Sequence, residues 1–157
     1  MNHNLLAGKK GINMNCQVNK VTSQAAIQRC FDIRIEVFVK GQNVPFEEDL
    51  DEKDALSDHY LLSIDDEPAG TARVRLEMDF AKIERVAILA AYQGRGYGNK
   101  LMKTILDDVK ANTQISKAKL SAQVYCIAFY ENLGFSVCSE EYMDAGIPHK
   151  DMQLRLR

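Results

Sequence analysis

The stretch Ile83–Met102, IERVAILAAYQGRGYGNKLM, passes from an apolar segment through a glycine-rich turn into an amphipathic segment. Beyond Gly98 the apolar residues recur at intervals of three and four, which predicts a helix with one apolar stripe. That stripe holds Leu101, Met102, Ile105, Leu106 and Val109. The first amide hydrogens of such a helix have no partner within it, the helix dipole is positive there, and glycine permits close approach. The turn therefore predicts an anion-binding site, supplemented by the cations Arg95 and Lys100.

Two common phosphate-binding motifs do not fit this turn. A Walker A loop, GxxxxGK[ST], requires a glycine where Asn99 stands, five residues after Gly94. A Rossmann fingerprint, GxGxxG, counted from Gly94 also ends on Asn99, and the strand before it belongs to a predicted meander rather than to a βαβ unit. The residues from Gln93 to Gly98 instead fit the pattern [Q/R]xxGx[G/A].

The segments around this turn predict an α+β fold. CQVNKV (16–21) alternates like a strand, and Thr22 or Ser23 is placed to cap a following helix. Short apolar runs separated by Gly, Pro and Asp predict an antiparallel meander before the glycine turn. The other predicted strands cover 59–64, 71–78, 82–89, 117–124, 135–142 and 151–156, and a short helix covers 126–134. The predicted architecture is a mixed, mainly antiparallel sheet with helices on both faces.

The composition limits the class of protein. The chain has 157 residues, 46% of them hydrophobic, with 20 Lys and Arg against 22 Asp and Glu. This balance predicts one soluble domain and argues against a general nucleic-acid binder. No apolar run reaches the roughly 18 residues of a membrane span, and the N-terminus lacks the apolar core of a signal peptide. We therefore expect a flexible tail over residues 1–14, one domain over 15–157, a cytoplasmic location, and neither membrane nor nucleic acid as partner.

The positions of the four cysteines argue against a metal site. They are far apart in the sequence, with no CxxC and no Cys/His pair at the spacing of metal ligands: Cys16, Cys30, Cys126 and Cys138. We expect reduced, mostly buried thiols and no metal.

Three features in this order resemble the GNAT superfamily of coenzyme A-dependent N-acetyltransferases. They are the meander, the strand, glycine turn and helix described above, and the later segment AFYENLGF (128–135). The resemblance covers most of the chain from about Cys16 onward. Two further segments, 34–61 and 141–152, are similar to a small bacterial subgroup whose substrates are mostly unassigned. The resemblance implies the acyl-CoA N-acyltransferase fold, acetyl-CoA as co-substrate, a small-molecule or peptide amine as acceptor, and a possible homodimer.

The resemblance also implies where acetyl-CoA binds. The strand before the glycine turn is expected to splay from its neighbour and to pair with the pantetheine arm through Val86, Ala87 and Ile88. A backbone amide near Ala87 or Ile88 then polarises the thioester carbonyl. Gln123 and Asn132 are weaker candidates for contact with the arm. The implied pyrophosphate cradle consists of Gln93, Gly94, Arg95, Gly96, Tyr97, Gly98 and Asn99.

Acetyl transfer to an amine requires proton handling at both reacting ends. The departing thiolate must gain a proton, and Tyr130 matches the family position whose hydroxyl supplies it. A phenol with an ordinary pKa near 10 is neutral at working pH and is able to donate. The competing interpretation is a packed tyrosine.

Glu84 is the candidate base, acting directly or through a water. It stands in an otherwise apolar strand, and strand alternation places it on the same face as Val86 and Ile88. Burial there raises a carboxyl pKa toward the useful range. The alternative is an ion pair with an arginine on a neighbouring strand position: Arg73, Arg75 or Arg85.

Three polar residues are candidates for substrate contact: Arg34, His59 and His149. Arg34 interrupts an apolar helical stripe, as a cation turned toward a pocket or as one that snorkels at the edge of the stripe. His59 opens a predicted strand, and His149 follows a turn sequence; a lone histidine is also often structural. Seven acidic residues between Glu47 and Asp58 form either a solvated surface or a rim that attracts a cationic amine.

The predicted function is therefore N-acetyl transfer by direct attack of an amine in a ternary complex. Cys126 keeps an acyl-cysteine route formally open, but no histidine neighbours it in the sequence. The alternative function is a non-catalytic module that binds coenzyme A as a sensor or interaction partner.

Overall fold

A computed structural model describes residues 15–157, so the tail predicted for 1–14 lies outside the described residues. One sheet organises the fold, with strand order β1-β2-β3-β4-β5-β8-β6 and β7 paired with β8. Every neighbouring pair is antiparallel except β4 and β5, which confirms the predicted mixed, mainly antiparallel sheet. The strands are β1 (Cys16–Val21), β2 (Asp58–Ile64), β3 (Glu67–Glu77), β4 (Phe80–Ile88), β5 (Lys117–Gln123), β6 (Ser136–Val137), β7 (Tyr142–Asp144) and β8 (Ile147–Arg155).

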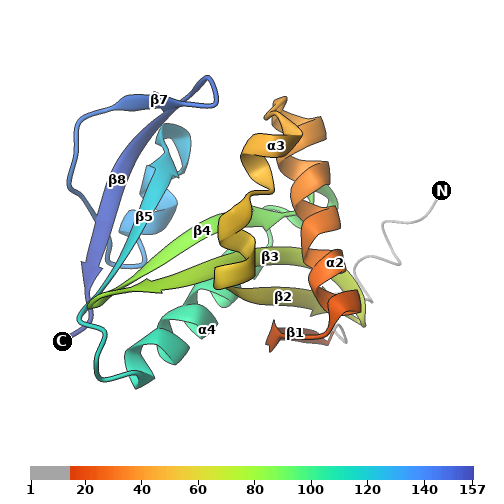
Figure 1. The fold of residues 1–157 in the computed structure, drawn as a ribbon, viewed down its shortest axis with the longest axis horizontal. Helices are drawn as coiled ribbons and strands as arrows, with labels where there is room; N and C mark the ends of the chain where they lie inside the picture. The colour runs from red at the N-terminus through yellow and green to blue at the C-terminus, as the bar shows by residue number, and fades with distance from the viewer. Residues whose placement is uncertain (1–14) are drawn as a thin grey trace.

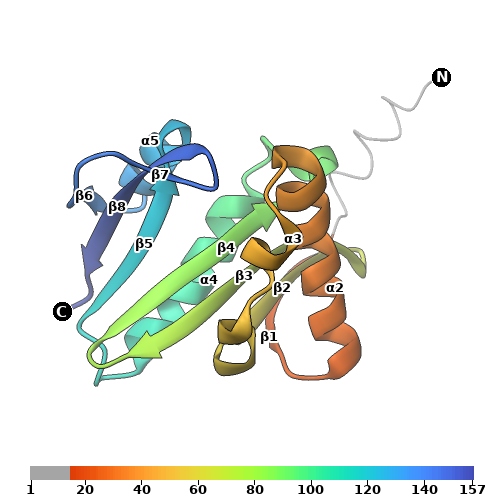
Figure 2. The same ribbon diagram turned by 45° about the horizontal axis from the view of Figure 1, so that its top comes forward.

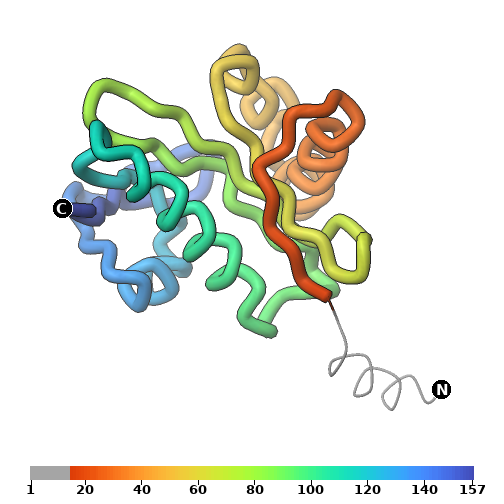
Figure 3. Tube along the Cα trace, turned by 90° about the horizontal axis from the view of Figure 1, so that it is seen from below, coloured from red at the N-terminus to blue at the C-terminus, as the bar shows by residue number. Residues whose placement is uncertain are grey.

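Helices cover both faces of the sheet, as predicted (Figures 1 and 3). On one face lie α2 (Gln24–Arg34), its π-helical continuation η1 (Ile35–Lys40), α3 (Phe46–Asp49) and the 3-10 turn η2 (Glu52–Leu56). On the other lies α4 (Tyr97–Ala111), and the short helix α5 (Ile127–Glu131) packs on β5 and β6. Two 3-10 turns, η3 (Ala90–Tyr92) and η4 (Val124–Cys126), lead into α4 and α5.

Local sequence signals explain where these elements begin and end. Ser23 caps α2 by accepting a hydrogen bond from the amide of Ala26, which selects it over Thr22 as the cap. Asp65 and Asp66 both have positive φ, 52° and 68°, as the two-residue hairpin between β2 and β3 requires. The single strand predicted for 135–142 is wrong. That segment forms β6 and the start of β7, which pair with different parts of β8.

Two hydrophobic cores hold the layers together. The larger core packs the predicted α4 stripe against the sheet, with Leu101, Met102 and Ile105 fully buried. The smaller core joins α2 to β2 and β4 through Cys30, Ile33, Leu61 and Ala87. The four cysteines are free, but only Cys30 is buried, whereas Cys16 and Cys126 are half-buried and Cys138 is exposed, so the prediction of mostly buried thiols is wrong.

The two strands β4 and β5 part soon after they meet (Figure 2). They pair in parallel only over Phe80–Lys82 and Lys117–Lys119. Beyond Lys82, no strand within the described residues 15–157 pairs with the edge of β4 that faces β5. The splayed strand implied by the family resemblance is therefore present.

A β-bulge interrupts β4 just before this open edge. Arg73 pairs with Glu84 and Thr71 with Ala87, so one residue of β3 stands opposite two of β4. Arg85, the first of these two, has φ 56°. A bulge shifts the alternation of side chains by one residue.

The bulge corrects one expectation about the candidate base. Ile83 belongs to the larger core, and after the bulge Val86 and Ile88 pack against that same core. Glu84, next to Ile83 in the strand, lies on the opposite face, where it meets Arg73. The expectation that Glu84 shares a face with Val86 and Ile88 is therefore wrong.

Candidate functional site

A cleft of about 780 Å³ opens where β4 and β5 diverge. One wall is β4 from Lys82 to Ile88, and the other includes the end of β5 and α5. The glycine turn closes one end, and the segment around Asp144–His149 lines another part. All the predicted acetyl-CoA residues except Arg95 line this cleft: Val86, Ala87, Ile88, Gln93, Gly94, Gly96, Tyr97, Gly98 and Asn99.

The glycine turn has the shape of an anion cradle. Gly94 and Gly96 have φ of 76° and 87°, which side-chain-bearing residues rarely adopt. A Cβ built on either of them meets nothing within 4 Å, so the space in front of the backbone is open. The 15-residue helix α4 begins directly afterwards at Tyr97. Open space, backbone without side chains and a helix N-terminus together fit a pyrophosphate group.

The polar side chains around the turn have structural partners. Gln93 donates through Nε2 to the carbonyl oxygen of Ile88 at 2.8 Å, which ties the turn to the end of β4. Lys100 donates to the carbonyl oxygen of Cys16 at 2.8 Å. Arg95 is exposed and lies outside the cleft lining. The expectation that these two cations supplement the cradle therefore gains no support here and stays a prediction.

Tyr130 lies in the cleft wall opposite β4. It is 9% exposed and packs edge-on against Phe129 and Phe135, with ring centroids 5.0 and 6.1 Å away. Burial raises the pKa of its phenol, and the neighbouring Cys126 and Tyr125 raise it further. The hydroxyl is therefore protonated across the physiological range, as a proton donor must be. Burial also raises the pKa of the Cys126 thiol, which weakens it as a nucleophile.

An amide bridge spans the cleft between its two halves. Gln42, just after η1, and Gln123, at the end of β5, exchange side-chain hydrogen bonds of 3.2 and 2.9 Å. Gln42 Nε2 also donates to the hydroxyl of Tyr125 at 2.9 Å. No local pattern in the sequence relates Gln42 to Tyr125, because the two residues stand 83 positions apart. The predicted cofactor contact Gln123 lies in the cleft but has its amide engaged here.

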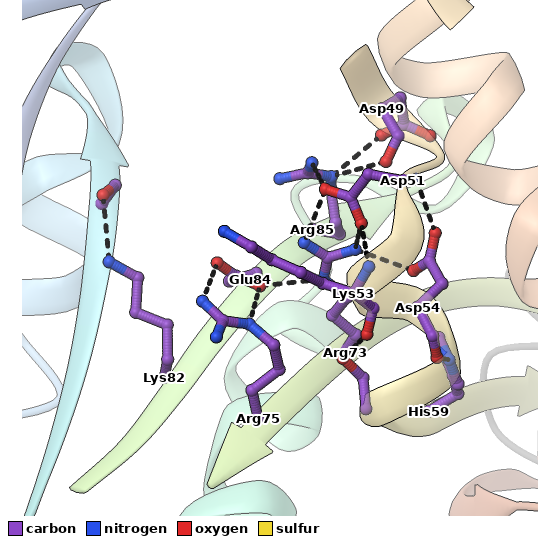
Figure 4. Close-up of polar contacts among 12 residues, drawn as sticks. Asp49, Asp51, Lys53, Asp54, His59, Arg73, Arg75, Lys82, Glu84 and Arg85 are labelled. Carbon is purple, nitrogen blue, oxygen red and sulfur yellow. Dashed lines mark hydrogen bonds and ion pairs between the residues drawn. The ribbon is translucent and has the colours of Figure 1, made fainter. Parts of the chain in front are cut away.

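Ion pairs fill the face of the sheet beneath α3 and η2 (Figure 4). Arg73, only 1% exposed, donates to Asp51 at 2.7 Å, to Asp54 at 2.8 Å and to Glu84 at 2.8 Å. Burial alone would lower the pKa of its guanidinium, but the hydrogen bonds to Asp51 and Asp54 and the charge of Glu84 raise it. Arg73 is therefore fully charged at the centre of three carboxylates.

Glu84 is held by two guanidinium groups rather than by one. Besides Arg73, Arg75 donates to it through Nε and Nη2, both at 3.0 Å. Burial favours a higher carboxyl pKa, but the hydrogen bonds and charges of the two arginines bring the pKa of Glu84 below its usual value. This geometry supports the ion-pair alternative, since a carboxylate with a lowered pKa is a weak base.

Two of the substrate candidates lie away from the cleft, within the same network. Arg34 is 1% exposed and pairs with Asp49 and Asp54 at 3.3 and 2.7 Å, because its apolar helix face turns it inward. His59 is 3% exposed and its Nε2 lies 2.9 Å from the carbonyl oxygen of Asp54. Neither residue lines the cleft, so the expected substrate contacts of Arg34 and His59 are wrong in this structure.

His149 does line the cleft. It stands opposite Gln123 in the β5–β8 register and stacks on Tyr142, with ring centroids 6.0 Å apart. Its Nδ1 is 2.7 Å from the carbonyl oxygen of Ile147. A carbonyl accepts hydrogen bonds, so Nδ1 carries the proton and Nε2 is the basic nitrogen.

The acidic segment is not a uniform rim around the cleft. Asp49, Asp51 and Asp54 turn toward the arginines of the sheet. Arg85, the bulge residue, also binds this segment: it donates hydrogen bonds to Asp51 at 3.2 Å and to the carbonyl oxygen of Asp49 at 3.0 Å. Three of the seven carboxylates thus form ion pairs that hold the segment to the sheet. These three carboxylates give no support to the hypothesis that an acidic rim attracts a cationic amine.

Residues 15–157 contain no group of three or more His, Cys, Asp or Glu side chains arranged to hold a metal ion. Within the same range no helix is long and apolar enough to cross a membrane.

Comparison with known proteins agrees with the fold and the cleft. Residues 18–156 match the family model described as an acetyltransferase (GNAT) domain. The chain is 37% identical over 131 residues to "Uncharacterized N-acetyltransferase YjcF" of Bacillus subtilis, covering 83% of this chain and 93% of the relative.

Solved structures share the same fold. An acyl-CoA N-acyltransferase from Pseudomonas aeruginosa superimposes with a TM-score of 0.79 at 25% identity, covering 90% of this chain and 99% of that one. A GNAT family acetyltransferase from Elizabethkingia anophelis, described with acetyl-CoA bound, has a TM-score of 0.71 at 15% identity, covering 90% and 98%. The matched domain, the curated relative and the cleft lead to one conclusion: the chain belongs to the GNAT acetyltransferase family, whose enzymes transfer an acyl group from acyl-CoA.

Proposed function

We propose that this enzyme transfers the acetyl group of acetyl-CoA to a primary amine of a small molecule or peptide, by direct attack while both substrates are bound. The observation that carries the proposal is the single cleft that joins an open glycine cradle, an unpaired strand edge and a protonated tyrosine. The neighbour from Elizabethkingia anophelis, described with acetyl-CoA bound, supports acetyl-CoA as the donor.

The backbone supplies most of the binding groups for acetyl-CoA. The amides at the start of α4 and the open glycines Gly94 and Gly96 receive the pyrophosphate. The edge of β4 from Val86 to Ile88 pairs with the extended, amide-bearing pantetheine arm, as an exposed strand edge pairs with an added strand. An amide near Ala87 or Ile88 stabilises negative charge on the thioester oxygen as the amine attacks.

Proton transfer is divided between two residues on the β5 side of the cleft. Tyr130 donates to the departing sulfur, because burial keeps its phenol protonated. Glu84 is a poor acceptor, since Arg73 and Arg75 hold its charged form. We assign removal of the ammonium proton to Nε2 of His149, whose Nδ1 is fixed by Ile147.

Thiol release tests the proposal. Acetyl-CoA is incubated with a panel of amines and peptides, free thiol is measured colorimetrically, and coenzyme A binding is measured separately by titration. Turnover with any amine supports the proposal that the protein catalyses acetyl transfer. Binding of coenzyme A without turnover on any amine would instead support the sensor or interaction module.

Two properties of the protein stay predictions alongside this function. Cytoplasmic location is tested by cell fractionation. Formation of a homodimer is tested by sedimentation at several protein concentrations.

A further inference from the structure

Three basic residues stand directly opposite one another across three neighbouring strands. Arg75 of β3 pairs with Lys82 of β4, and Lys82 pairs with Lys119 of β5. Residues paired in register share a face of the sheet, and Ala81 and Ala118, beside the two lysines, belong to the core on the α4 side. The three residues, termed the cation row, therefore lie on the face opposite α4. Like charges directly opposite each other destabilise a sheet, so this arrangement needs a compensating partner.

Among residues 15–157, only one member of the cation row forms close ion pairs. Arg75 is paired with Glu77 at 2.7 Å and with Glu84 at 3.0 Å. Lys82 and Lys119 have no carboxylate within 4.0 Å among residues 15–157, although both side chains are half-buried.

Neutral groups hold the two lysines in place instead. Lys82 Nζ is 3.5 Å from the hydroxyl of Ser121, and Lys119 Nζ is 4.2 Å from the centre of the Phe80 ring. Burial alone would raise the pKa of the nearby Asp151 carboxyl, but hydrogen bonds from Tyr142 and Ser121 and the charges of Lys82 and Lys119 lower it, so Asp151 partly balances the two lysines without forming an ion pair with either. An ammonium group has three donors, so each lysine retains hydrogens for an external acceptor.

The cation row faces a hollow that joins the cleft. This hollow has a volume of about 540 Å³ and is lined by all three cations, by Gln153, the register partner of Lys119, and by the carboxylates of Glu77 and Asp151. Lys82 and Leu120 line both the hollow and the main cleft. A molecule bound with its amine in the cleft can therefore extend into the hollow.

We propose that the cation row binds a carboxylate or phosphate carried by the acceptor amine. This inference rests on the proposed function and narrows its acceptor to amines that also bear an anionic group. Lys82 and Val86 are four residues apart, one of them taken up by the bulge, so about 10 Å of strand separates the row from the acyl site. An acceptor with several bonds between its amine and its anion, such as an ω-amino acid or a phosphorylated amino alcohol, spans this distance.

Matched acceptors test the inference in the full-length enzyme. Hexylamine, 6-aminohexanoate and 6-aminohexyl phosphate share one chain and differ only at the far end. We expect kcat/KM for the two anionic amines to exceed that for hexylamine by about tenfold or more. That ratio should fall by about tenfold in Lys82→Met and in Lys119→Met, which keep the apolar stem, and return in Lys82→Arg and Lys119→Arg. Lys103→Met, on the exposed surface of α4, is the matched control and should keep the wild-type ratio.

A binding measurement separates this inference from the proposed function. Inorganic phosphate, at constant ionic strength, should raise the Tm of the wild type more than that of the Lys82→Met/Lys119→Met double variant, whereas Lys103→Met should respond like the wild type. If hexylamine is acetylated as fast as its anionic analogues, the inference is overturned while the proposed function stands. If no amine releases thiol, the proposed function fails, and equal phosphate responses in the wild type and the double variant would then overturn the anion site too.

Discussion

Arg73 donates through Nε to Glu84 Oε2 over 2.8 Å, and this pair stands immediately before the bulge that begins at Arg85. The pair lies on the face occupied by α3 and η2, whereas Val86 and Ile88 pack toward the larger core. The bulge thus turns Glu84 and Val86 to opposite faces of β4, although Glu84, Arg85 and Asp49 of the charged network also line the cleft. Through its ion pairs with Arg73 and Arg75 of β3, Glu84 fixes the start of the β4 edge that faces the cleft.

Replacing Glu84 by Gln should therefore affect stability more than catalysis. Gln keeps the shape but removes the charge that balances Arg73 and Arg75, so the free energy of unfolding should fall by about 2–3 kcal/mol. The pH at which kcat/KM is half-maximal should stay unchanged, because the hydrogen bonds and charges of Arg73 and Arg75 already hold Glu84 in its charged form. Urea denaturation and pH–rate profiles measure the two effects. Loss of the acid limb in Glu84→Gln at undiminished stability would instead make Glu84 the base.

Tyr130→Phe should lower kcat by about tenfold or more, because the departing thiolate then lacks its proton donor. The ring packing against Phe129 and Phe135 is retained, so acetyl-CoA should bind within about twofold of the wild type. Stopped-time thiol release and equilibrium titration of coenzyme A measure the two quantities. An unchanged kcat would remove Tyr130 from the mechanism, and a parallel loss of binding would mark it as a packing residue.

Gly96→Val should weaken acetyl-CoA binding by about 100-fold, because a branched side chain fills the open cradle and strains a backbone with φ 87°. Gly146→Val is the matched control. Gly146 also has a positive φ, 76°, and open space around its Cβ; it lies in the turn between β7 and β8, outside the glycine turn, and does not itself line the cleft although its neighbours Ala145 and Ile147 do. Both variants should lose stability, and only Gly96→Val should lose binding by calorimetric titration. Equal affinity in the two variants would contradict the cradle.

Local patterns in the sequence were sufficient for the elements that form the cradle. The strand, glycine turn and α4 depend on residues that are neighbours along the chain, and the periodic stripe of α4 correctly predicted Leu101, Met102 and Ile105 as core. The roles of residues within β4 were harder to predict. Strand alternation placed Glu84 with Val86 and Ile88, and no propensity indicated that the bulky Arg85 would adopt a positive φ and shift the alternation.

Partners distant in sequence account for the remaining differences. Arg34 meets Asp54, and Lys82 meets Lys119, only after the strands have taken their register. The alternation of Lys82 with buried Ala81 and Ile83 does signal an outward-facing lysine, but the parallel pairing that brings Lys119 beside it is a tertiary property. The sequence of the acidic segment indicates a solvated surface, because the arginines that neutralise its carboxylates lie elsewhere in the chain.

Asp54 joins α2 to the sheet by accepting hydrogen bonds from Arg34 at 2.7 Å and from Arg73 at 2.8 Å. Burial alone would raise its pKa, but these two hydrogen bonds and the charge of Arg34 lower the pKa to about 2. An unfolded aspartate titrates near 3.9, so the unfolded chain binds more protons than the folded one between these values. The stabilisation is therefore complete above about pH 5 and is lost as the pH falls toward 2.

Asp54→Asn should show this linkage directly. At pH 7 the variant leaves two buried guanidinium groups without their shared carboxylate, so its free energy of unfolding should be lower by about 3–5 kcal/mol. Between pH 5 and about 2 its stability should fall less steeply than that of the wild type, because one titrating group with a lowered pKa is gone. Asp58→Asn, which removes a half-exposed ion pair with Lys20 at 3.6 Å, is the control and should keep the wild-type slope. Urea denaturation at each pH gives the slopes, and parallel curves for Asp54→Asn and the wild type would show that Asp54 carries no such linkage.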